Sequence, residues 1–366
     1  MTHRIGHRFS HGHLLVHAGP TAPGDVPAIV VPTIRNPAAI RDALRLGKEL
    51  SRPVVALCSR WSSPETVCRE AEMIGAHVIA VDVTERSALP AFACDSLVRE
   101  AAMIGLDRPN DVSRKRNLGI TVARMLGWHG VVFLDDDITD LQPDAIRTAA
   151  GLLRAHNVAA LQNVGFPDNS VVCHARREVD LTQDTFVGGG AMAVRVTSQT
   201  SFFPTIYNED WLFLVGRKRI ERVAVCGKVS QREYDPYLSP ARARAEEFGD
   251  VLAEGLFALS GEDRPVQAAT EDYWRAFLDD RRRMIDLILG RLAEQPAGDR
   301  RHRMTQALIG ARGRSLVIDP AFCVRYLAAW RDDLEVWRRF LAGLPRHRDA
   351  AEAFVALGLK VYENRP

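Results

Sequence analysis

Short apolar runs separated by helical segments dominate residues 26–230 and constrain the fold more than any other feature. Four of these runs are AIVVPT (28–33), PVVALCS (53–59), HVIAVDV (77–83) and VVFLDDD (131–137). A continuous apolar run of this length is typical of a strand that is buried on both faces. Segments with helical spacing lie between the runs, at 37–50, 64–75 and 112–127. This alternation predicts an α/β fold with a doubly wound, mainly parallel, Rossmann-like sheet, whose ligands bind beyond the carboxyl ends of the strands.

The pattern changes after about residue 230, where helical periodicity replaces the strands. The helical segments are 240–260, 270–294, 300–311, 320–342 and 347–360, with joints at 261–265 and 294–299. Because 366 residues exceed the size of one small core, we predict an α/β domain at 26–230 and a helical C-terminal region at 231–366.

Residues 1–25 contain five histidines and end in a segment rich in Gly and Pro. Their spacing defines no metal-ligand geometry, so we expect a flexible arm or a short hairpin.

Composition excludes several classes of protein. A net charge of +2 with dispersed arginines gives no reason to expect a nucleic-acid partner. The six cysteines form no C-x-x-C pair, which favours reduced, buried thiols. No run approaches the length of a membrane span, and the basic N-terminus lacks the apolar stretch of a secretory signal. We therefore expect a cytoplasmic protein, with peripheral membrane contact left open.

Three adjacent carboxylates, Asp135, Asp136 and Asp137, follow the apolar VVFL run. They must emerge at the carboxyl end of the strand because charge is costly inside a sheet. A divalent cation would relieve their mutual repulsion, and oxygen ligands suit Mn²⁺ or Mg²⁺ holding a diphosphate. Strand alternation would place Asp135 and Asp137 on one side and Asp136 on the other. A helix cap, or a phosphotransfer or nuclease site, would use the same residues.

Two further segments suggest contacts with an anion or an acceptor. In SRKRNLG (113–119), Lys115 and Arg116 lie in the first turn of a predicted helix, where cations are disfavoured unless they meet a negative group such as a diphosphate. In VGGGAMAVRV (187–196), three glycines precede a strand, which permits a close approach to a ligand or a simple glycine turn. NEDWLF (208–213) begins a short predicted helix.

Together these segments resemble the GT-A glycosyltransferases, especially family 2, whose layout is "RN-G … LDDD … GG-A-R … ED". The matching stretches run in order from AIVVPTIRN through SRKRNLG, FLDDDI and VGGGAMAVRV to NEDWLF, and cover roughly residues 26–215. VPTIRN followed by an Asp triplet also resembles the reversibly glycosylated polypeptides, which act as UDP-arabinopyranose mutases. The first resemblance implies a GT-A fold and a metal-dependent, inverting transfer from a UDP- or GDP-linked sugar to the hydroxyl of an unidentified acceptor.

The resemblance also implies roles for individual residues. Asp210 would be the general base, and Glu209 would orient the acceptor. Trp211 and Gly188 would contact the acceptor, and Asp137 with Asp135 would hold the metal. The implied donor-binding residues are Thr33, Arg35, Lys115, Arg116, Asn117, Asp135, Asp136, Gly189 and Gly190.

The sequence departs from the family pattern at two places. The acidic residue that commonly follows the second strand and binds the base is replaced by CSRWSS, where neither Ser59 nor Arg60 can act in the same way. The later metal-binding histidine is absent from VSQREYDPY, which offers Gln231 and Arg232. Alternative functions are a UDP-sugar mutase, a nucleotidyltransferase, a metal-dependent phosphatase and a non-catalytic nucleotide-sugar-binding protein. The absence of a Gly-rich loop after the first strand disfavours the nucleotidyltransferase.

Overall fold

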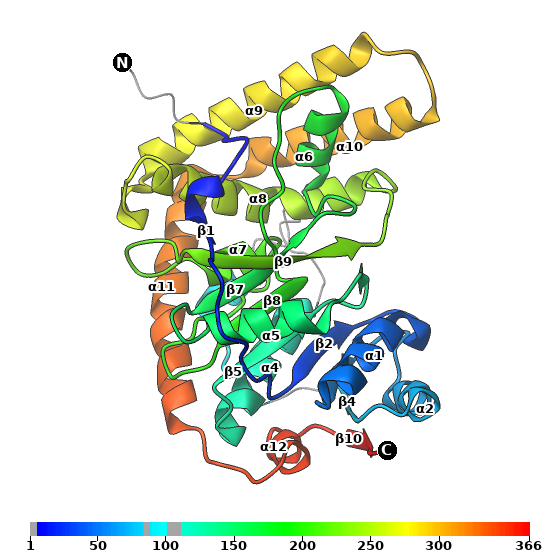
Figure 1. Cartoon of the computed structure of the whole chain (residues 1–366). Helices are drawn as coiled ribbons and strands as arrows, with labels where there is room; N and C mark the ends of the chain where they lie inside the picture. The colour runs from blue at the N-terminus through cyan, green and yellow to red at the C-terminus, as the bar shows by residue number, and fades with distance from the viewer. Residues whose placement is uncertain (1–5, 84–87, 101–110) are drawn as a thin grey trace.

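A mostly parallel mixed sheet organises the chain (Figure 1). The computed structural model describes residues 6–83, 88–100 and 111–366. The strand order is β1-β9-β7-β8-β5-β2-β3-β4-β10, with β6 paired to β9, and only the pairings of β6, β8 and β10 are antiparallel. The strands are β1 (Leu15–His17), β2 (Ile29–Thr33), β3 (Val54–Cys58), β4 (Val78–Asp82), β5 (Gly130–Leu134), β6 (Ile138–Thr139), β7 (Val158–Asn163), β8 (Ala191–Arg195), β9 (Val223–Gln231) and β10 (Val361–Asn364).

Every residue of β2, β3 and β5 is buried, because helices cover both faces of the sheet. Alternate side chains of one strand enter two different cores: Val30 belongs to one, and Ile29 and Val31 to the other. The helices on the Ile29 face are α1 (Arg41–Leu50), α2 (Pro64–Ile74) and α5 (Pro143–Leu152). On the Val30 face, α3 (Ala93–Glu100) and α4 (Val112–Leu126) contribute to the core. The predicted doubly wound, mainly parallel α/β architecture is confirmed.

The direction of winding reverses at β2, and this reversal fixes the place of a ligand site. β2 pairs in parallel with β3 on one side and with β5 on the other. A crevice forms beyond the carboxyl ends of two such strands because their following connections leave in opposite directions. The antiparallel β8 begins at this same edge, so the glycines at 188–190 arrive beside the end of β5; the amide of Asp135 donates to the carbonyl of Gly190 (2.9 Å).

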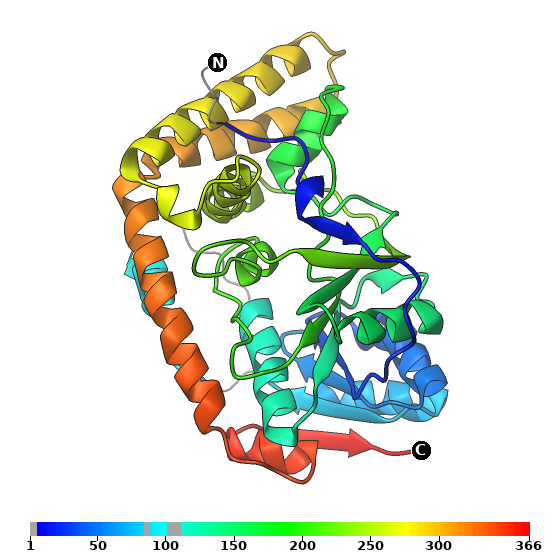
Figure 2. The same ribbon diagram turned by 60° about the vertical axis from the view of Figure 1, so that its left-hand side comes forward.

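The C-terminal helices are α8 (Pro240–Ser260), α9 (Glu271–Ala293), α10 (Asp299–Val317), α11 (Pro320–Gly343) and α12 (Ala350–Ala356). Most of them extend the core of the sheet, whereas α10 packs with parts of α8 and α9 in a separate cluster. Side chains from α8, α9, α11 and α12 share one hydrophobic cluster with Val30 and Phe133 of the sheet. In Figures 1 and 2, α11 runs along the side of the molecule to α12, and α9 lies beside α10. The helix predicted at 347–360 is shorter in the structure, where α12 ends at Ala356, and β10 follows it and pairs with β4.

The described part of the N-terminal segment packs onto the body of the protein, unlike the flexible arm that was expected. β1 pairs in parallel with β9, after a short 3-10 helix, η1 (Gly12–Leu14). His11 is only 4% exposed, and the side chain of His7 is only 1% exposed. The backbone pairing of β1 with β9 holds the segment in place and covers an edge of β9 that would otherwise be open. His3, part of the same expected arm, lies outside the described residues.

All six cysteines are free, and four of them are buried, in agreement with the expectation of reduced thiols. Within the described ranges, no helix combines the length and the apolar character that crossing a membrane requires.

Candidate functional site

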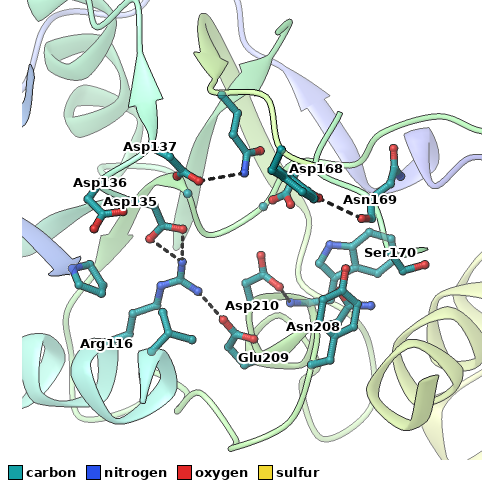
Figure 3. A pocket seen from close by; sticks show the side chains of 18 of the residues that line it. Arg116, Asp135, Asp136, Asp137, Asp168, Asn169, Ser170, Asn208, Glu209 and Asp210 are labelled. Carbon is teal, nitrogen blue, oxygen red and sulfur yellow. Dashed lines mark hydrogen bonds and ion pairs between the residues drawn. The ribbon is translucent and has the colours of Figure 1, made fainter. Parts of the chain in front are cut away.

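A cavity of about 440 Å³ lies where β2 and β5 end, at the reversal of winding (Figure 3). Among the described residues, nine acidic and five basic side chains line it, so negative charge is in excess in this set. The acidic residues are Asp111, Asp135, Asp136, Asp137, Asp168, Glu209, Asp210, Asp250 and Glu254. The basic residues are Arg35, Arg60, Lys115, Arg116 and Arg242. Segments that are far apart in the sequence therefore meet at one acidic cavity.

The Asp triplet lies in a turn after β5 rather than on the strand itself. Strand alternation therefore does not govern its side chains, and that part of the prediction is wrong. Asp136 accepts a hydrogen bond from Thr33 Oγ1 (2.7 Å), and Arg35 pairs with both Asp136 and Asp137 (2.9 Å for Asp137). Burial and the carboxylates of Asp135 and Asp136 raise the pKa of Asp137, and Arg35 offsets only part of this effect.

Arg116 connects the triplet to the NED segment. Its guanidinium donates to both carboxylate oxygens of Asp135 (2.9 and 3.0 Å) and to Glu209 Oε1 (2.9 Å). Burial alone would lower the pKa of Arg116, but Asp135, Glu209 and Asp210 outweigh it and raise the pKa. The guanidinium also explains why residue 189 is a glycine, since a Cβ at this position would lie 2.6 Å from Arg116 Cζ.

Two backbone amides fix the carboxylate of Asp210. Gly189 N–H donates to Oδ2 (2.6 Å), and Trp211 N–H donates to Oδ1 (2.9 Å). The predicted helix is α7 (Glu209–Phe213). Asn208 precedes it, and its side chain makes no capping hydrogen bond. Asn208 adopts a left-handed conformation (φ 58°) and donates its side-chain amide to Asp250 (3.1 Å). Asp210 is thus held by the glycine turn and faces the cavity (Figure 3).

Asp168 is a candidate site residue that was missed from the sequence. It lies in the loop after β7, and a Cβ on Gly188 would lie 3.0 Å from Asp168 Oδ2 and 3.1 Å from Asp210 Oδ2. Asp168 as a residue is exposed, whereas its carboxyl lies among the protein groups that line the cavity. This burial, with the charges of Asp210, Asp135 and Asp137, raises the pKa of Asp168 to about 7.

Lys115 is fully buried at the wall of the cavity, and protein groups engage its amino group. Nζ donates to the carbonyl of Thr33 (2.9 Å) and to Ser59 Oγ (2.7 Å), and it pairs with Asp111 (3.0 Å). Burial lowers the pKa of Lys115, while Asp111 acts in the opposite direction. Asp111 therefore supplies the negative charge that the sequence argument assigned to a bound diphosphate, and Lys115 connects the ends of β2 and β3.

Three other predicted residues make contacts that differ from the expectation. Asn117 exchanges hydrogen bonds with the backbone of Phe203 (2.9 and 2.8 Å), inside the core behind the cavity. Trp211 lines the cavity, but its ring stacks on Phe257 at 4.6 Å. Arg232, one of the two residues that the sequence offers in place of the metal-binding histidine, pairs with Asp42 (2.9 Å).

Gln231 does reach the triplet, because its side-chain amide lies 3.4 Å from Asp137 Oδ2. Arginines of the chain itself, Arg35 and Arg116, neutralise part of the triplet. The charge conflict that suggested a metal is therefore relieved in part without one. The Asp triplet is not the group of His, Cys and carboxylate side chains that comes together most closely among the described residues. That group is His7, Cys173 and Glu254, whose ligand atoms all lie within 4.8 Å of one another.

No protein-family model matches the chain. A search of curated proteins likewise finds no significant match. The fold and the cavity define an α/β protein with an acidic site at the reversal of its sheet, and the function is inferred from that geometry.

Proposed function

We propose that the acidic cavity binds a nucleoside-diphosphate sugar and transfers the sugar to an acceptor hydroxyl, in the manner of the GT-A glycosyltransferases. One observation carries the proposal: the triplet, the glycine turn and Asp210 come from three distant segments and line the same cavity. Arg116 and the Gly189 amide link these segments directly. A cap or a glycine hairpin would explain each motif separately, but neither explains their convergence.

The residues present fit a divalent cation at Asp135 and Asp137. Burial first, and then the carboxylates of Asp135 and Asp136, raise the pKa of Asp137, and a cation would relieve the repulsion among the carboxylates. Mg²⁺ commonly binds through one or two carboxylates and completes its coordination with substrate phosphates and water. Two protein ligands are thus sufficient when a diphosphate is present. When bound, Mn²⁺ or Mg²⁺ would stabilise the charge of the departing diphosphate.

Asp210 is the proposed general base. The acceptor oxygen attacks the anomeric carbon, the bond from that carbon to the diphosphate oxygen breaks, and the hydroxyl proton passes to the Asp210 carboxylate. The two amide donors fix the direction of the Asp210 carboxylate. A Cβ on Gly188 would lie 3.0 Å from Asp168 Oδ2 and 3.1 Å from Asp210 Oδ2, so both carboxyl groups face the same point. With a pKa of about 7, Asp168 holds a proton up to neutral pH.

Asp111 compensates for the acidic residue that is missing after the second strand. It lines the cavity beside Arg60, and Lys115 and Ser59 (2.5 Å) hold its carboxylate in place. We therefore assign base recognition of the donor to Asp111, with the prediction that Asp111→Asn alters the preference among uridine, guanosine and thymidine donors.

The test is a thermal-shift panel of UDP-, GDP- and dTDP-sugars, with and without Mn²⁺. A ligand at 100 times its Kd stabilises the folded state by about 2.7 kcal/mol. We expect one donor class to raise the melting temperature in a Mn²⁺-dependent manner. Asp137→Asn should abolish this shift, and the control Asp144→Asn, whose side chain is 94% exposed, should retain it. The absence of any Mn²⁺-dependent shift in the wild type would contradict the proposal.

Asp210→Asn separates binding from chemistry. We expect it to preserve the donor-induced shift and to abolish sugar transfer; loss of donor binding would exclude Asp210 as the base. Incubation with UDP-arabinopyranose in the absence of an acceptor distinguishes the mutase, which would isomerise the sugar, from the transferase.

A further inference from the structure

The wall of the cavity formed by α6 (Val171–Glu178) and α8 contains a second cluster that the proposed transfer reaction does not use. His7, Cys173 and Glu254 each direct one ligand atom to a common point, with all three atoms within 4.8 Å of one another. The residues come from the N-terminal segment, α6 and α8. We propose that they form a transition-metal site, suited to Zn²⁺, that fastens the N-terminal segment to the wall of the cavity.

Hydrogen bonding of His7 leaves one ring nitrogen available for a metal. Nε2 lies 2.8 Å from Gln183 Oε1, an oxygen that only accepts, so Nε2 carries the proton. The amide orientation of Gln183 is supported by its Nε2, which donates to the carbonyl of Asp184 (3.2 Å). Nδ1 of His7 therefore presents a lone pair, is buried, and has no hydrogen-bond partner. Its distance to Glu254 Oε2, 3.6 Å, is too long for a hydrogen bond.

The surroundings of the cluster also suit a metal. His11 Nε2 contacts Glu254 Oε2 at 2.8 Å, an outer contact of the kind that orients ligands in metal sites. The neighbouring cation, Arg281, is matched by Glu247 (2.9 Å) and Asp250 (2.5 Å).

The ligand types favour Zn²⁺ over Mg²⁺ or Ca²⁺. Thiolate and imidazole are soft or borderline ligands that select Zn²⁺ and related transition metals, whereas Mg²⁺ and Ca²⁺ require oxygen. On binding, the Cys173 thiol releases its proton to solvent. The thiolate and Glu254 then balance the two charges of the ion. Because Cys173 and Glu254 line the cavity, a bound ion would be reached by water or a ligand from that side.

Cobalt substitution tests the site. Chelator-treated, refilled wild-type protein should retain one Co²⁺ after gel filtration and show a near-ultraviolet thiolate-to-cobalt absorption band. Cys173→Ser should lose the band, whereas the control Cys226→Ser, at a partly buried thiol in β9, should keep it. His7→Gln, in the N-terminal segment, should weaken Zn²⁺ binding at least about 100-fold, and His11→Gln about 10–100-fold.

A wild-type protein that retains no Co²⁺, or a Cys173→Ser variant with an unchanged band, would overturn the proposal. Circular dichroism of each variant checks folding, and His7→Gln provides a second route if Cys173→Ser does not fold. Asp137→Asn should leave the cobalt band intact, because it belongs to the proposed donor site; the two proposals therefore fail independently.

Discussion

Arg116 provides the most direct test of how the site is held together. Arg116→Met keeps most of the side-chain volume and removes the cation that bridges Asp135 and Glu209. Breaking a buried ion pair by removing one partner typically costs 3–5 kcal/mol. The side chains of Arg116 and Glu209 are 3% and 10% exposed, but that of Asp135 is 30% exposed and partly screened by water. We therefore expect a loss near the lower limit, about 3 kcal/mol.

Urea unfolding followed by circular dichroism measures this loss as a change in the free energy of unfolding at constant m value. Addition of Glu209→Gln to Arg116→Met should recover part of the loss, because it removes one carboxylate that the cation had neutralised. The control Arg147→Met breaks an exposed pair with Asp144 and should cost no more than about 1 kcal/mol. A loss below about 1 kcal/mol for Arg116→Met, or no recovery in the double variant, would refute the reasoning.

Two further predictions concern the same cavity. Gly189→Ala places a methyl group 2.6 Å from Arg116 Cζ, so we expect a loss of about 1–3 kcal/mol in urea unfolding; in the Arg116→Met background a smaller loss should follow, and an equal one would exclude the guanidinium as the cause. Asp168→Asn tests the pH dependence. Because the folded pKa of Asp168, about 7, exceeds the unfolded value of about 4, the wild type loses stability from this group as the pH rises between the two values. The full shift corresponds to about 4 kcal/mol, which screening by cavity water reduces to about 1–2 kcal/mol. The variant should therefore be more stable than the wild type by that amount at about pH 8 and equal to it below about pH 4, as measured by thermal unfolding; equal stability at both would contradict the raised pKa.

The parallel core was predictable from the sequence because burial on both faces leaves continuous apolar runs. AIVVPT and PVVALCS became β2 and β3 within one residue at each end. The edge strands β1 and β10 are half exposed and short, so they carry no such signal. Their existence depends on pairing with β9 and β4, which is a tertiary effect.

The candidate site was predictable where residues follow a recognised strand, and not elsewhere. Asp135 and Asp137 were found because they terminate an apolar run. Asp168 was missed because β7 was not recognised before it; identification of VAALQN as a parallel strand would have placed the next loop at the same edge. The ion pair of Lys115 with Asp111, four residues earlier, is visible in the sequence, but its contacts with Ser59 and Thr33 were not predictable because these residues are 56 and 82 positions away.

The position of β10 affects how the protein is made. Val78 of β4 pairs with Asn364 of β10, 286 positions later in the chain. At about 5–20 residues per second, on the order of 15–60 s of synthesis separates the two partners. During that interval the nascent chain would present the outer edge of β4 without its final strand, and an open edge promotes intermolecular pairing. Pairing of residues 361–364 with β4 then covers this edge of the sheet.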